Sequence, residues 1–194
     1  MRALALQADV TDRDAAASLV RDAHVRLGSL AVLVNNVGNY VYAPLDELTF
    51  EEWDDVLRTN LDATFSTCRE AVPRMRAAGG GRIVNIGYAG SQSLVGRPNL
   101  AAYAIAKTGV VLLTRAIARA EAGNGITANV VAPGVIETSR TKPLSEIPAG
   151  RTGTVDEVAA AILYLASPEA AYVTGQVLEG RRRLEPLATP LREA

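Results

Sequence analysis

The sequence predicts an α/β fold in which helices cover both faces of a doubly wound parallel sheet. Short apolar runs with strand character alternate with longer helix-like segments, and the connections between them are short. Right-handed crossovers through such helices place the strands side by side in one sheet. A length of 194 residues with 48% hydrophobic residues suits one domain over residues 1–180, followed by a tail at 181–194.

The first strands and helix are expected before residue 35. Residues 3–8 predict a short strand, and Thr11 or Asp12 can cap the following helix, which ends at Gly28. The run at 30–34 is continuously apolar and rich in β-branched residues, which is typical of a parallel strand buried on both faces.

The segment Asn35-Asn36-Val37-Gly38 follows this strand directly. Ligands bind at the carboxyl ends of the strands in open α/β sheets, so both amides are well placed to meet one. The same four residues also fit a plain turn.

Two long helices are expected at 50–78 and 101–122. The first has acidic residues in its first turns, where the helix dipole favours negative charge, and Pro73 is expected to bend it. Asn60 lies in its middle, where an amide needs either solvent or a specific partner. The glycines at 79–81 precede a strand rather than a helix, so they predict a helix terminator and not a phosphate loop.

The second half of the chain continues the alternation. It predicts strands at 82–86 and 126–131, a helix at 155–166 opened by a capping box, and a final strand at 172–178. The irregular loop at 137–153 contains prolines and glycines and is long enough to act as a lid or a substrate wall.

The helix at 101–122 carries a candidate proton-transfer pair. Tyr103 and Lys107 are four residues apart, so the phenol and the ammonium share a helix face. A fixed cation nearby would lower the pKa of the phenol from its ordinary value of about 10. The chain uses lysine only at 107 and 142 and arginine elsewhere, although the same spacing also fits an ordinary amphipathic helix.

Composition excludes several classes of function. A net charge of −1 provides no electrostatic footprint for nucleic acid or an anionic membrane. The single cysteine, Cys68, and the single histidine, His24, argue against a metal site built from these residues. The sequence shows no apolar run of membrane-spanning length and no signal peptide, so a cytoplasmic location is expected.

In this order the motifs resemble the classical short-chain dehydrogenase/reductase family, which has a Rossmann-like fold, over about residues 3–180. The matching positions are the acidic turn Asp9-Val10, the segment Asn35-Asn36-Val37-Gly38, Asn60, the pair Tyr103 and Lys107, and Pro133-Gly134 with Thr138. The resemblance implies an NAD(P)-dependent oxidoreductase acting on a small-molecule carbonyl, alcohol or imine. It favours NADP slightly over NAD.

The resemblance also implies a role for each motif. Tyr103 would protonate a carbonyl oxygen, or deprotonate an alcohol in reverse, while Lys107 binds the nicotinamide ribose and lowers the pKa of Tyr103. Asn60 would hold a water in a proton relay. Pro133 and Gly134 would cradle the nicotinamide, and the acidic turn would meet the adenine ring.

Two features depart from the family pattern. The family's catalytic serine follows the strand at 82–86, where this sequence has Tyr88; Ser91 is the nearest hydroxyl and Ser93 lies behind it. We take Ser91 as the candidate, with Tyr88 and Ser93 as alternatives. The sequence also contains no Gly-x-x-x-Gly-x-Gly turn, so the expected Rossmann-like sheet is truncated on its N-terminal side.

Without the strands that flank such a turn, residues 3–8 would have to pair with residues 30–34 or with another chain. A second hypothesis is therefore a catalytically silent short relative that serves as a structural or interaction subunit. In both cases the resemblance implies a homodimer or homotetramer assembled through the helices at 50–78 and 101–122.

Overall fold

Four parallel strands form the sheet in the computed structural model, which describes residues 3–94, 96–139, 147 and 149–180. The strands lie side by side in the order β1 (Val32–Asn35), β2 (Gly81–Ile86), β3 (Ile126–Ala132) and β4 (Val177–Glu179). The predicted parallel α/β sheet is confirmed. Because the strands are parallel, all four carboxyl ends lie at one edge of the sheet.

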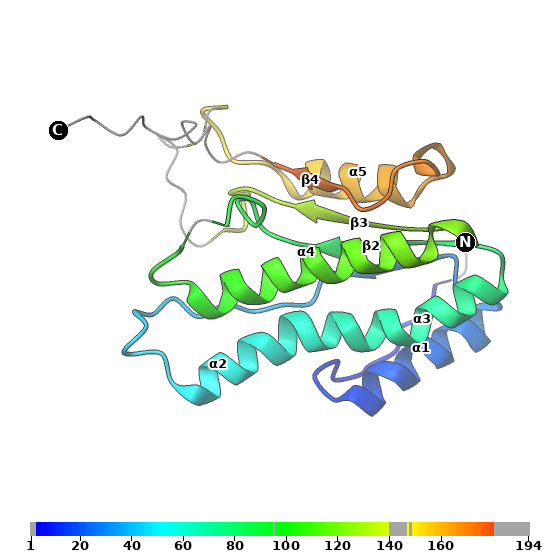
Figure 1. Cartoon of the computed structure of the whole chain (residues 1–194), viewed down its shortest axis with the longest axis horizontal. Helices are drawn as coiled ribbons and strands as arrows, with labels where there is room; N and C mark the ends of the chain where they lie inside the picture. The colour runs from blue at the N-terminus through cyan, green and yellow to red at the C-terminus, as the bar shows by residue number, and fades with distance from the viewer. Residues whose placement is uncertain (1–2, 95, 140–146, 148, 181–194) are drawn as a thin grey trace.

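Helices cover both faces of this sheet, with α1 to α4 on one side and α5 on the other (Figure 1). Their bounds are α1 (Arg13–Leu27), α2 (Phe50–Leu57), α3 (Ala63–Ala77), α4 (Ala101–Glu121) and α5 (Val155–Ala166). On one face Met75 of α3 packs against Ile83 and Ile126. On the other face Leu165 of α5 packs against Val84 and Val131. The sheet is therefore doubly wound, as predicted.

The first predicted strand is wrong. Residues 3–8 belong to no strand, and the side chain of Leu4 is 38% exposed. They do not pair with β1, whose ladder partner is β2. A strand is stabilised by ladder hydrogen bonds, and an isolated extended segment has none to make.

The expectation that residues 30–34 would be buried on both faces is also wrong. β1 is the edge strand of the described sheet, and Val32 and Val34 are each 40% exposed. Every residue of β3, which has neighbours on both sides, is buried. An apolar sequence predicts a buried strand only if neighbouring elements cover it.

The predicted helix at 50–78 is one continuous helical run with a change of winding in its middle. Thr49 caps α2 through a capping box with Glu52, and residues Arg58–Asp62 form a π-helical turn before α3 begins. Pro73 lies inside α3, which continues to Ala77, and the change of winding lies at the π turn. Asn60 lies in that turn and is fully buried.

By length and mean hydropathy, α4 together with its terminal 3₁₀ turn (Ala122–Asn124) could cross a membrane, which corrects the expectation from sequence. However, α4 packs along β3 and buries Lys107. We therefore interpret it as the central helix of this α/β domain.

The C-terminal elements follow the prediction closely at α5 and less closely at β4. Thr154 and Glu157 form the predicted capping box of α5, whereas β4 is shorter than the strand expected at 172–178. At the base of the predicted loop, the amide of Glu137 donates to the carbonyl of Gly153 at 2.9 Å. Residues 140–146 and 148 of that loop, and the predicted tail at 181–194, lie outside the described residues.

Candidate active site

Tyr103 and Lys107 lie one turn apart on α4, as predicted, beside the carboxyl end of β2. The Lys107 Nζ donates a hydrogen bond to the carbonyl of Ile86, the last residue of β2, at 2.8 Å. It lies 5.9 Å from the centroid of the Tyr103 ring. The helix and the strand end are thus joined by the ammonium group, which fixes the side chain of Lys107 beside the phenol.

Burial sets the pKa of both groups. Burial, with a smaller contribution from the nearby phenols of Tyr88 and Tyr40, raises the pKa of Tyr103 to about 12. It lowers the pKa of Lys107 to about 8. The expected lowering of the Tyr103 pKa is wrong for the chain alone, because loss of water disfavours the phenolate.

Two aromatic rings flank Tyr103. The centroid of the Tyr40 ring lies 5.8 Å away with an interplanar angle of 59°, and that of Tyr88 lies 5.5 Å away at 53°. Tyr40 was missed by the sequence reasoning, although it lies only two residues after Gly38 at the end of β1.

Asn60 and Gly38 form a tight contact next to Lys107. The Asn60 amide nitrogen donates to the carbonyls of Asn39 and Val56, both at 2.9 Å, whereas its Oδ1 is buried without a partner among the described residues. A Cβ on Gly38 would lie 2.4 Å from the Asn60 Oδ1 and 3.3 Å from the Lys107 Nζ. Both polar atoms therefore border the same small space, which only glycine leaves open.

The two amides that end β1 have different surroundings. Asn36 is exposed, as a ligand contact requires. Asn35 instead donates to the Oδ1 of Asn85 at 2.8 Å and accepts from the Thr67 hydroxyl at 2.8 Å. The prediction that its amide meets a ligand is corrected, because that amide is already bonded on both sides inside the protein. The sequence did offer one signal for this pairing, because Asn85 lies opposite Asn35 in the ladder of β1 and β2.

Asp9 and Val10 lie in the turn before α1. The Asp9 carboxylate accepts from both the backbone amide and the hydroxyl of Thr11, and these hydrogen bonds hold its pKa below the usual value. One residue later, Asp12 caps α1 by accepting from its first amides. That helix N-terminus is already satisfied by a carboxylate, so it does not fit a phosphate group.

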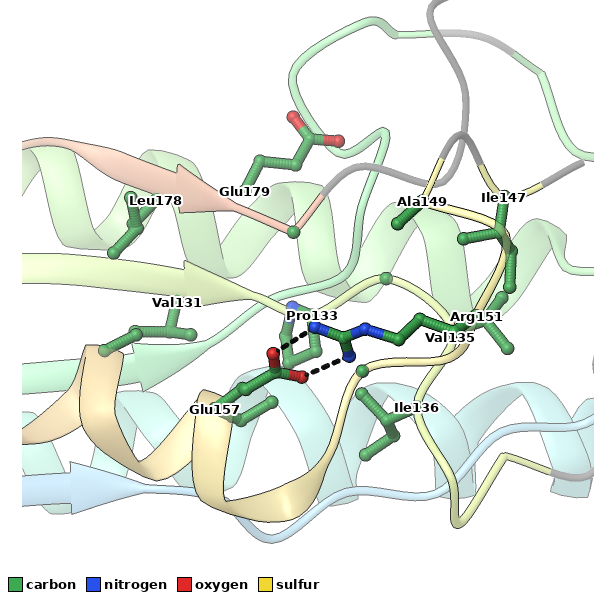
Figure 2. Close-up of a pocket in the computed structure, with 15 residues that line it drawn as sticks. Val131, Pro133, Val135, Ile136, Ile147, Ala149, Arg151, Glu157, Leu178 and Glu179 are labelled. Atoms are coloured by element: carbon green, nitrogen blue, oxygen red, sulfur yellow. Dashed lines mark hydrogen bonds and ion pairs between the residues drawn. The ribbon is translucent and has the colours of Figure 1, made fainter.

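Pro133 and Gly134 follow β3 and line a cavity of about 300 Å³ between the ends of β3 and β4 and α5 (Figure 2). Its polar wall includes Arg151 and Glu157, whose carboxylate accepts from the guanidinium at 2.6 and 2.9 Å. Thr138 is exposed in the turn that follows and is not among the residues lining this cavity.

The candidate serine is enclosed. Ser91 is 2% exposed, and its Oγ makes no hydrogen bond within the described part of the chain, whereas Ser93 is exposed. The backbone amide of Ser91 donates to the carbonyl of Tyr88, so Ser91 and Tyr88 belong to one turn after β2. The Tyr88 ring, as described above, contacts Tyr103.

A family model described as enoyl-(acyl carrier protein) reductase matches residues 1–179. The chain is 38% identical over 183 residues to the 3-oxoacyl-[acyl-carrier-protein] reductase FabG of Vibrio harveyi, covering 89% of this chain and 74% of that protein. The chain belongs to the short-chain dehydrogenase/reductase family. By this resemblance it is an NAD(P)-dependent oxidoreductase.

Solved structures of family members share the fold. A putative short-chain alcohol dehydrogenase from Sinorhizobium meliloti 1021 superposes with a TM-score of 0.86 and 35% identity, over 92% of this chain and 74% of that one. A gluconate 5-dehydrogenase from Burkholderia cenocepacia J2315, solved with NADP and tartrate, superposes with a TM-score of 0.83 and 34% identity, over 90% of this chain and 72% of that one.

Proposed function

We propose that the chain interconverts a carbonyl or imine and the corresponding reduced small molecule, with Tyr103 as the proton donor and acceptor. The observation that carries this proposal is the partly buried Tyr103 phenol one helical turn from a lysine that is anchored to the end of β2. The family resemblance supports the same role.

The residues at the strand ends fit the nicotinamide half of NADP or NAD, with NADP slightly favoured. When bound, such a cofactor supplies or accepts a hydride. The Lys107 Nζ has one described protein acceptor, the carbonyl of Ile86, which leaves N–H groups for ribose hydroxyls. Asn36, Pro133, Gly134 and Thr138 are the other candidate contacts.

Fewer residues of this chain fit the adenosine half of the cofactor. We retain Asp9 and Val10 as candidates for the adenine ring, although the Asp9 carboxylate already accepts two hydrogen bonds from Thr11. The N-terminus of α1 does not serve the phosphates, because Asp12 caps it. Cofactor affinity of this chain therefore depends mainly on the residues around Lys107.

The proton path runs through groups of this chain. Because the pKa of Tyr103 is about 12, its phenol is protonated at neutral pH and suited to protonating a carbonyl oxygen. A water bound to the unpartnered Oδ1 of Asn60 would lie in the space next to Lys107 and could return a proton towards the site. In this scheme a hydroxyl from the turn after β2 polarises the carbonyl, and Ser91 and Tyr88 are the two candidates in that turn.

Titration of the purified chain with NADPH and NADH, followed by turnover assays with carbonyl compounds, tests this function. Tyr103→Phe removes only the hydroxyl, so we expect it to bind cofactor normally and lose at least about 100-fold in kcat. Tyr164→Phe, on the outward side of α5, is the matched control. Unchanged turnover by Tyr103→Phe would refute the proposal. A folded chain that binds neither cofactor would favour the silent-subunit hypothesis.

We also propose that two copies, or two pairs of copies, assemble through α3 and α4 in the cytoplasm. Large apolar side chains on these helices are exposed, with Phe65 at 49%, Ile105 at 51% and Leu112 at 61%. Ile105 and Leu112 of α4 also line a largely apolar cavity of about 910 Å³. Leu112→Glu should give a monomer in light scattering if this face is the interface.

A further inference from the structure

The rings of Tyr40 and Tyr88 stand beside Tyr103, and proton transfer alone does not require either of them. Tyr40 comes from the segment after β1 and Tyr88 from the turn after β2, yet both centroids lie within 5.8 Å of the Tyr103 centroid. Tilted ring pairs at such distances attract each other. Tyr40 is 42% exposed, so the three-ring cluster reaches the surface and offers an open aromatic face.

The segment that carries Tyr40 is held in place by Asn99, just before α4. The Asn99 side chain donates to the Tyr42 hydroxyl at 3.0 Å, and its backbone carbonyl accepts from the amide of Ala43 at 3.0 Å. Since α4 also carries Tyr103, the segment and the phenol are held together. A ligand meeting this cluster therefore meets rings that are already positioned.

Three residues after β2 carry a candidate hydroxyl, and Tyr88 is the one that contacts Tyr103, through its ring. The Oγ of Ser91 is buried within its turn, and Ser93 is exposed. The crowding of three rings also excludes water, which agrees with the raised pKa of Tyr103. The tyrosine is thus better placed than either serine to reach an atom held by Tyr103.

We propose that Tyr40 and Tyr88 form an aromatic wall that selects a planar, conjugated carbonyl compound, and that the Tyr88 hydroxyl donates a hydrogen bond to its carbonyl oxygen. The inference rests on the proposed function, because it places the reacting carbonyl at Tyr103. A flat π-system keeps ring contacts with both tyrosines, whereas a puckered saturated ring keeps fewer.

Equilibrium dialysis with two carbonyl probes that are not reduced tests the wall directly. The probes are 2-naphthamide and its saturated counterpart decahydro-2-naphthamide, each measured with and without NADP⁺. We expect the flat probe to bind about 5-fold or more tightly than the saturated one. Equal affinity for the two probes, or no binding of either, overturns the proposal.

Variants separate the ring from the hydroxyl. Tyr40→Leu removes one of the two rings and should at least halve the preference for the flat probe, whereas Tyr40→Phe, which keeps the ring, should retain it. Tyr88→Phe should weaken both probes about 5-fold while leaving their ratio unchanged. Tyr172→Leu removes a fully exposed tyrosine before β4, at the amino-end side of the sheet, and should change nothing.

If Tyr88→Phe binds both probes as the wild type does, the hydroxyl role is wrong. If Tyr40→Leu keeps the full preference while remaining folded by circular dichroism, the wall is wrong. Neither result depends on turnover. A chain that prefers the flat probe but reduces no carbonyl with NADPH would instead contradict the proposed function and leave the aromatic wall standing.

Discussion

Asn85 and Asn60 are both fully buried asparagines, yet their amides have different surroundings. The Asn85 Oδ1 accepts from Asn35, and its Nδ2 donates to the Thr114 hydroxyl at 2.9 Å. Asn60 donates its amide nitrogen to backbone carbonyls but leaves its Oδ1 without a partner among the described residues. The first network joins two strands to α4, and the second leaves an acceptor facing the candidate site.

The difference separates structural from functional amides. A buried polar atom without a partner is costly, so it persists where a ligand or water completes it. A fully bonded network contributes to the uniqueness of the core. We therefore expect changes around Asn85 to affect stability first and changes around Asn60 to affect activity first.

The largest expected effect is that of Gly38→Ala. The new Cβ would lie 2.4 Å from the Asn60 Oδ1, so it must displace Asn60 or Lys107 from their positions. We expect turnover to fall about 100-fold or more. Gly123→Ala, whose Cβ would meet nothing within 4 Å, is the control. Steady-state kinetics measure both, and equal rates would show that this space has no role in the reaction.

Asn85→Ala should cost about 3 kcal/mol of folding free energy, because it removes the hydrogen bonds to Asn35 and Thr114 and opens a small cavity. Urea unfolding measures the change. The control is Asn36→Ala, since Asn36 is the exposed neighbour of Asn35. A loss no larger than that of the control would mean that the network is not structural.

Asn60→Ala should affect turnover more than stability, the opposite of Asn85→Ala. We expect a loss of about 1 kcal/mol in stability and a reduction of roughly 10-fold or more in kcat, because the site loses the acceptor that holds the relay water. Thermal melts and kinetics on the same sample give both numbers. A stability loss as large as that of Asn85→Ala with normal turnover would erase the contrast between the two regions.

The smallest expected effect is a dependence of stability on pH. The pKa of Lys107 is about 8 in the fold, below the ordinary lysine value of 10.5, so the unfolded chain binds more protons between these values. Stability should therefore rise from about pH 8 to pH 10 by an amount on the order of 1–2 kcal/mol. The pKa of Tyr103, raised to about 12, reverses the trend above pH 10.

Urea unfolding of the wild type and of Lys107→Met across this range checks the sign. The difference in stability between the two proteins should change in favour of the wild type as the pH rises from 8 to 10. A difference that stays constant would mean that the buried amine does not titrate in this range.

Much of the fold could be predicted because its signals are local. Asp12 caps α1, and Thr154 with Glu157 caps α5, through side chains within three residues of each helix start. The strand at 3–8 could not be judged in this way, since a strand exists only with a partner. The π turn at 58–62 could not be predicted either, because the spacing of apolar residues shows no sign of it.

The candidate site was predicted in part for the same reason. Tyr103 and Lys107 share a face because helical spacing alone brings them together. Whether Asn35 faces the core or a ligand depends on Asn85, which is 50 residues away along the chain. The ring of Tyr40 reaches Tyr103 because of the path of the loop after β1. No periodic pattern in the sequence predicts the path of a loop.

The exposed valines of β1 have a consequence for handling the protein in concentrated solution. An edge strand presents unpaired backbone groups, and here Val32 and Val34 add apolar surface beside them. Such a strand can template a sheet between molecules while their helices remain folded. Precipitation on storage should therefore begin at β1, and additives that weaken intermolecular strand pairing should extend the shelf life of the sample.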